Sequence, residues 1–254
     1  MELIKSVARR SKVSDVAYVL LNIALAIAIY VLTIAFTPPY FAYALVLLSK
    51  WRVFAVRPRF WLANIQGNMV DALVGVSTVT LIWRADGQMV VQVLLTVLYI
   101  AWLLILKPRS RRKAMIAQAE ISQFIALIAL FGVAHYLDSS IVVALCWVIG
   151  YVAAWHGLQS YDEDDVYLLS FIWGLVIAEL GWLSYQWTSA YTLAGDLMVP
   201  QGAIIVGLVG HLMMQAYNHQ YHKTLTWKRL RAPVLFSILV VAMMLLRELS
   251  VLAG

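Results

Sequence analysis

Three polar side chains lie on one face of an otherwise apolar stretch, residues 61–83. Asn64, Asn68 and Asp71 are spaced i, i+4 and i+7. At about 100° per residue, these positions stay on one side of a helix. In a bilayer-spanning helix a charged carboxylate costs at least about 2.5 kcal/mol unless it is paired, hydrated or protonated. The pattern therefore indicates a polar face inside a bundle, with Asp71 near the middle of the membrane.

Two further apolar stretches place ionisable groups at a similar depth. Glu179 lies near the centre of 166–188, and His211 lies midway along 201–221, with Gln215 one helical turn further on. Buried carboxylates at this depth would exchange protons near neutral pH. The sequence thus predicts a substrate or ion pathway, and the alternative is that these groups only bond helices together. The predicted pathway residues are Asn64, Asn68, Asp71, Glu179, His211 and Gln215.

A second group of ionisable residues lies in or beside the loops. His156, His219 and His222 end two apolar stretches, and Asp162 begins an acidic run. Imidazole and carboxylate suit zinc, iron or manganese, but the spacing matches no metal-binding motif. The acidic run is better explained as a solvated turn that favours the dipole of the following helix. We therefore expect no metal, no cofactor and no catalytic residue, and these four residues stay as candidates only for a metal site.

Composition determines the class of protein. The chain has 254 residues, of which 63% are hydrophobic and 13% charged, with a mean hydropathy of +0.82. A soluble domain is about half apolar and a quarter charged. The sequence therefore predicts an all-α membrane protein. Its net charge of +6 lies mostly in short loops, which indicates contact with anionic lipid headgroups rather than nucleic acid.

Hydropathy and breaks in the chain predict a basic N-terminal segment, 1–15, followed by a single transmembrane domain, 16–254. The second span has an apolar core too short for a bilayer, so its helix is expected to run on to residue 56 with its lysine and arginine side chains reaching the interface. The nine predicted spans are 16–36, 39–56, 61–83, 88–106, 114–137, 139–155, 166–188, 201–221 and 233–252.

Charge predicts the orientation of these spans. With a cytoplasmic N-terminus, the inner segments are 1–15, 50–60, 107–113, 156–165 and 222–231, and they hold 17 of the 19 lysines and arginines. This asymmetry follows the positive-inside rule. The sequence predicts a multi-pass protein of the inner, cytoplasmic membrane with its C-terminus outside.

Three functions fit this architecture. The leading interpretation is a small permease or a proton- or ion-coupled transporter, for which Asp71→Asn would abolish transport and leave the fold intact. The first alternative is a non-catalytic assembly or partner subunit. The second is a membrane-embedded enzyme that modifies lipid through a His/Asp site at the cytoplasmic face. An enzyme is expected less than a transporter, because no specific catalytic motif is found in the sequence.

Overall fold

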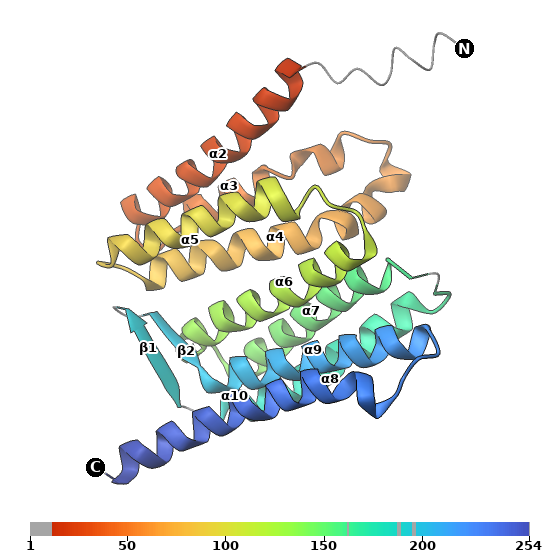
Figure 1. Cartoon of the computed structure of the whole chain (residues 1–254). Coiled ribbons are helices and arrows are strands. Elements are labelled where there is room, and N and C mark those ends of the chain that lie inside the picture. Colours follow the sequence, from red (N-terminus) through yellow and green to blue (C-terminus); the bar gives the residue numbers. More distant parts are fainter. Residues whose placement is uncertain (1–11, 162, 187–188, 195–196, 254) are drawn as a thin grey trace.

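The computed structural model describes residues 12–161, 163–186, 189–194 and 197–253, and nearly all of them are helical (Figure 1). One two-stranded antiparallel sheet interrupts the helices, with Tyr191 opposite Val199. The α-helices and strands are α2 (Lys12–Ala35), α3 (Tyr40–Leu48), α4 (Trp61–Arg84), α5 (Met89–Ala101), α6 (Arg112–Val133), α7 (Ser139–Leu158), α8 (Val166–Tyr185), β1 (Ala190–Ala194), β2 (Leu197–Pro200), α9 (Gln201–Tyr221) and α10 (Trp227–Ala253). Short segments are η1 (Trp51–Phe54), η2 (Pro58–Phe60), the π-helical η3 (Trp102–Leu106) and η4 (Ala134–Tyr136).

The helical fold class is confirmed. Within the described ranges, seven helices are long and apolar enough to cross a membrane: α2, α4, α5 with η3, α6, α7, α8 and α10. Helix α3 has only nine residues, or about 13 Å at 1.5 Å per residue. Helix α9 is long, but polar side chains such as His211 and Gln215 lower its hydropathy. Each of the nine predicted spans overlaps one α-helix, while nine membrane crossings remain a prediction.

Two details of the predicted spans are wrong. The helix of the second span ends at Leu48 and does not run on to residue 56. The last helix begins at Trp227 and passes through Pro233, because proline removes one N–H and does not end a helix whose neighbours support it. Between the seventh and eighth predicted spans, the chain contains the β1–β2 hairpin.

The helices form two packed groups (Figure 1). One buried cluster joins α2, α3, α4 and α5, and a second joins α6, α7, α8 and α9. Helix α10 lies against α9 and keeps most of its apolar side chains exposed. Exposed apolar side chains of this extent are what a helix facing lipid carries.

The connections alternate between two ends of the bundle (Figure 1). We call one end the basic end; it contains segments 49–60, 107–111, 159–161, 163–165 and 222–226. The other is the hairpin end, with the turn at 85–88 and the β1–β2 hairpin. The described segments that were predicted to face the cytoplasm thus gather at one end of the bundle, as the alternating topology requires.

Arg112 ties three elements together at the basic end. Its Nε donates to the Ser160 carbonyl at 3.0 Å, and its guanidinium lies 4.8 Å from the centre of the Tyr161 ring. Tyr161 in turn donates to Oδ1 of Asn218 at 2.8 Å. Burial raises the pKa of the Tyr161 phenol, so this hydroxyl stays protonated as a donor. The start of α6 is therefore fixed against the α7–α8 loop and the end of α9.

Small residues allow α7 and α8 to pack closely. A Cβ atom on Gly150 would lie 2.8 Å from Ile177 Cβ and 3.1 Å from the Gly174 Cα. Gly150→Leu is therefore expected to lower the free energy of unfolding by at least about 1–3 kcal/mol, because backbone on α8 cannot move aside. Chemical unfolding of the detergent-solubilised protein measures this. Gly67→Leu is the matched control, since a Cβ there meets nothing within 4 Å. Equal effects of the two substitutions would contradict the close α7–α8 contact.

Candidate functional site

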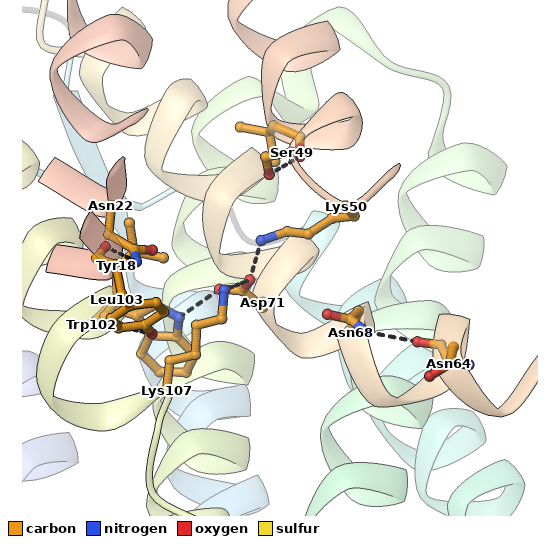
Figure 2. Close-up of polar contacts among 11 residues, drawn as sticks. Tyr18, Asn22, Ser49, Lys50, Asn64, Asn68, Asp71, Trp102, Leu103 and Lys107 are labelled. Atoms are coloured by element: carbon orange, nitrogen blue, oxygen red, sulfur yellow. Dashed lines mark hydrogen bonds and ion pairs between the residues drawn. The ribbon is translucent and has the colours of Figure 1, made fainter. Parts of the chain in front are cut away.

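Asp71 lies in a buried charged cluster (Figure 2). Its Oδ2 pairs with Nζ of Lys50 and, at 2.6 Å, with Nζ of Lys107. Its Oδ1 accepts a hydrogen bond from Nε1 of Trp102 at 3.1 Å. The side chain of Asp71 is 8% exposed, that of Lys50 12% and that of Lys107 31%. We call these four residues the Asp71 cluster; it holds one carboxylate between two ammonium groups.

The short helix α3 brings Lys50 to Asp71. Because α3 ends at Leu48, the chain turns while it is still beside the middle of α4, and Lys50 follows in that turn. Its side chain points inward onto α4 (Figure 2). Lys50 was expected to extend outward to the membrane interface, whereas the structure directs its side chain to a carboxylate on α4, which stabilises the ammonium group.

The π-helical segment η3 brings Trp102 and Lys107 to the same carboxylate. The Lys107 N–H bonds to the Trp102 carbonyl at 2.9 Å, which is the i to i+5 bond of a π-turn. A π-turn rotates the following residues relative to an α-helix and is found frequently at functional sites. Here the Trp102 indole and the Lys107 side chain both reach Asp71.

Gly75 allows α3 and α5 to approach α4 next to the cluster. A Cβ at this position would lie 2.7 Å from Val46 Cγ1 of α3 and 3.1 Å from Oη of Tyr99 of α5. Tyr99 is 2% exposed, and its hydroxyl has no hydrogen-bond partner in the described part of the chain. A buried hydroxyl without a partner usually bonds to water or a ligand.

An apolar cavity of about 470 Å³ adjoins the cluster. Its walls come from α4, α5, η3 and α6, and β2 contributes Leu197 and Val199. Tyr99 and Trp102 line it, so the indole that donates to Asp71 also borders the cavity. We call this space the apolar cavity. Its lining residues are Val74, Thr78, Leu81, Leu95, Leu98, Tyr99, Ala101, Trp102, Ile105, Leu106, Ile121, Phe124, Ile125, Ile128, Leu197 and Val199.

Asn64 and Asn68 each bond to the backbone carbonyl four residues earlier in the chain. Nδ2 of Asn64 donates to the Phe60 carbonyl at 3.1 Å, and Nδ2 of Asn68 donates to the Asn64 carbonyl at 2.8 Å. Figure 2 shows this pair on the side of Asp71 away from Trp102. The two asparagines share a helix face with Asp71, as expected from the spacing, but the hydrogen bonds found among the described residues do not join them to its cluster.

The other predicted pathway residues have different surroundings. His211 Nδ1 pairs with Oε1 of Glu120 at 3.1 Å, and Gln215 Nε2 donates to the same oxygen at 3.3 Å. Glu179 is exposed on α8. The structure therefore brings His211 and Gln215 together through Glu120, whereas the polar contacts of the described residues join neither Glu179 nor His211 to Asp71.

Helix packing explains why Glu179 points outward. Gly174, Ile177 and Gly181 face α7, and they follow the i, i+3, i+7 spacing of one helix face. Glu179 is two residues from Ile177, or about 200° around the helix. Depth along a helix follows from sequence position, but the direction of a side chain depends on which face packs.

The candidate metal ligands are held by separate partners. Nε2 of His156 contacts Oε1 of Gln118 at 2.6 Å, and Nε2 of His222 contacts a guanidinium nitrogen of Arg112 at 3.3 Å. His219 lies 3.4 Å from the Thr224 hydroxyl. Asp162 lies outside the described residues. Among the residues that are described, no three histidine, cysteine or acidic side chains are grouped as a metal site requires.

Lys50, Lys107, Trp102 and Glu120 were missed as site residues. The sequence uses the two lysines only as signals of orientation. The shortness of the apolar segment before Lys50 was the signal that this lysine lies deep. No comparable signal identifies Lys107 or Trp102, because the π-turn that redirects them has no sequence pattern of its own.

Comparison of the chain with protein-family models, with curated proteins and with solved structures found no match. Function is therefore inferred from residue chemistry and geometry alone.

Proposed function

We propose that this protein is a small multi-pass permease of the cytoplasmic membrane that moves an amphipathic substrate. The observation that carries the proposal is the junction at Trp102, where the apolar cavity borders the buried Asp71 cluster. An apolar lining suits the apolar body of a substrate. Ionisable groups within a membrane helix are rare and lie mostly on substrate or ion pathways.

The Asp71 cluster could bind the charged group of a substrate. It contains one more positive than negative group, and Lys107 is the more exposed of its two lysines. An anionic group entering beside Trp102 would compete with Asp71 for Lys107 while Lys50 still neutralises Asp71. This role differs from a proton path through Glu179 and His211, because the polar contacts found among the described residues do not join either group to the cluster.

Transport by purified protein in liposomes tests the proposal. The probe is a fluorophore-labelled alkyl sulfonate, which crosses bilayers slowly because it remains charged, and dithionite added outside reports the outer-leaflet fraction. Wild-type proteoliposomes are expected to equilibrate the probe faster than empty liposomes. Ile125→Trp, which fills the apolar cavity, should reduce this rate to that of empty liposomes.

A matched control separates cavity filling from general damage. Ile141→Trp places the same side chain on α7 at a residue that is 46% exposed, and it should leave the rate unchanged. Equal rates with wild-type protein and with no protein would contradict the proposal. So would undiminished transport by Ile125→Trp.

A second candidate function is a subunit of a larger membrane assembly, and Glu179 favours it. On α8, Leu168, Ile172, Leu175, Glu179 and Trp182 form one exposed stripe at i, i+4, i+7, i+11 and i+14. An acidic side chain directed at lipid costs at least about 2.5 kcal/mol, which a donor on a partner helix would offset.

Glu179→Leu is expected to release the protein from such an assembly. Cross-linking in native membranes, followed by electrophoresis, measures the size of the wild-type and variant species. Ile172→Leu on the same stripe is the control and should keep the wild-type size. A wild-type species that migrates as a monomer would remove this candidate.

A further inference from the structure

A second, basic pocket continues the apolar cavity along α6. This basic pocket has a volume of about 810 Å³ and lies at the basic end of the bundle. Leu106 lines both spaces. Its lining residues are Leu106, Pro108, Arg109, Ser110, Arg111, Lys113, Ala114 and Ala117.

One face of α6 runs through both spaces. Ala114 and Ala117 line the basic pocket, and Ile121, Ile125 and Ile128 line the apolar cavity. These residues follow one another at spacings of three or four, so they form a single stripe on the helix. A long ligand lying along this stripe would have one end among cations and the other among apolar side chains.

The cations of the basic pocket are available to a ligand. Arg109, Arg111 and Lys113 are exposed, and no ion pair found among the described residues involves them. The neighbouring Lys107 is paired with Asp71. Helix α6 also begins here with no acidic residue in its first turn and no side-chain cap. Its first N–H groups add to the positive potential at this point.

Gln118 holds the basic loop in place. Its Nε2 donates to the Leu106 carbonyl at 2.6 Å and to the Arg109 carbonyl at 2.9 Å. Its Oε1 contacts His156 on α7, and Gln118 is only 4% exposed. The loop that carries Arg109 is therefore fixed before any ligand arrives, which reduces the entropy lost on binding.

We propose that the basic pocket and the apolar cavity together bind one anionic phospholipid. Its phosphate lies among Arg109, Arg111 and Lys113, and one acyl chain follows the α6 stripe into the apolar cavity. The unpartnered Tyr99 hydroxyl on the wall of that cavity is a position for a polar atom of the ligand or for water. This inference rests on the proposed function in one respect: an anionic phospholipid would be the class of amphipathic substrate that the proposed permease moves.

Lipid binding tests the headgroup contact. Delipidated protein in neutral detergent is titrated with phosphatidylglycerol or phosphatidylcholine, and native mass spectrometry gives the dissociation constants. Phosphatidylglycerol should bind more tightly, and the triple variant R109Q/R111Q/K113Q should bind it about 100-fold more weakly, because each basic residue near anionic lipid contributes about 1 kcal/mol. The control K223Q/K228Q/R229Q removes three exposed charges from the α9–α10 turn and the start of α10 at the same end and should bind like wild type.

A second experiment tests whether an acyl chain of the lipid occupies the apolar cavity. Ile125→Trp should weaken the binding of phosphatidylglycerol and leave competition by water-soluble glycerol phosphate unchanged. If glycerol phosphate alone competed as strongly as the lipid, the site would be a phosphate site and the proposal would be overturned. Equal losses of affinity in the two triple variants would also overturn it, because only general surface charge would then matter.

The outcomes separate this inference from the proposed function. Loss of phosphatidylglycerol binding in R109Q/R111Q/K113Q, with no transport of the alkyl sulfonate by wild type, would support the lipid site and remove the permease. Transport by wild type with unchanged lipid binding in the triple variant would support the permease and overturn the lipid site.

Discussion

Asp71→Asn is expected to lower the free energy of unfolding by about 3–5 kcal/mol, the typical effect of removing one partner from a buried ion pair. The variant would leave Lys50, with a side chain only 12% exposed, beside a neutral amide. Denaturant unfolding in detergent, followed by tryptophan fluorescence, measures the change. The sequence predicted that Asp71→Asn would leave the fold intact. Because the structure pairs this carboxylate with two lysines, a loss of stability is expected instead.

A double substitution tests whether the unpaired charge of Lys50 causes the loss of stability in Asp71→Asn. Asp71→Leu combined with Lys50→Met removes the buried opposite charges together and should recover most of the lost stability, since an apolar pair of similar size is often no less stable. Asp164→Asn, in an exposed loop, is the control and should have little effect. If Asp71→Asn is as stable as wild type, the Asp71 cluster does not hold the helices together.

Gln118→Leu is expected to lower the free energy of unfolding by about 2–4 kcal/mol, because each buried polar group left without a partner costs about 1–3 kcal/mol. The substitution removes the bonds to the Leu106 and Arg109 carbonyls and to His156. It should also release the basic loop, so the backbone amides of 107–111 should exchange hydrogen faster. Hydrogen–deuterium exchange and the same unfolding assay measure the two effects.

The control for Gln118→Leu is Gln159→Leu, at an exposed residue just after α7. It changes the same side chain and should alter neither stability nor exchange at 107–111. Unchanged exchange in Gln118→Leu would mean that Arg112 alone fixes the basic loop. The two variants also separate local loosening from global loss of stability, because exchange is read segment by segment.

Much of the helical fold was predictable because its signals are local. The predicted span 61–83 agrees with α4 to within one residue, and 201–221 coincides with α9. Both begin beside proline or charged residues and contain a long apolar run, which depends only on neighbouring residues. The length of α3 was not predicted, because its end is stabilised by Lys50 pairing with a residue on another helix.

The candidate site was predictable only in part. Sequence spacing identified Asp71 as a buried carboxylate and placed His211 and Gln215 on one face, and both share Glu120 in the structure. The partners of Asp71 could not be found in this way. Lys107 and Trp102 depend on a π-turn, and Glu179 depends on which face of α8 packs against α7.

The sequence by itself determined the all-α class, the approximate ends of most helices and the anomaly at Asp71. These follow from composition, hydropathy and the cost of a charge among apolar residues. Only the tertiary structure decided that two lysines and an indole surround Asp71 and that an apolar cavity borders the same indole. The physical reason is that hydropathy specifies how far along a helix a residue lies, whereas close packing against neighbouring helices specifies the direction in which its side chain points.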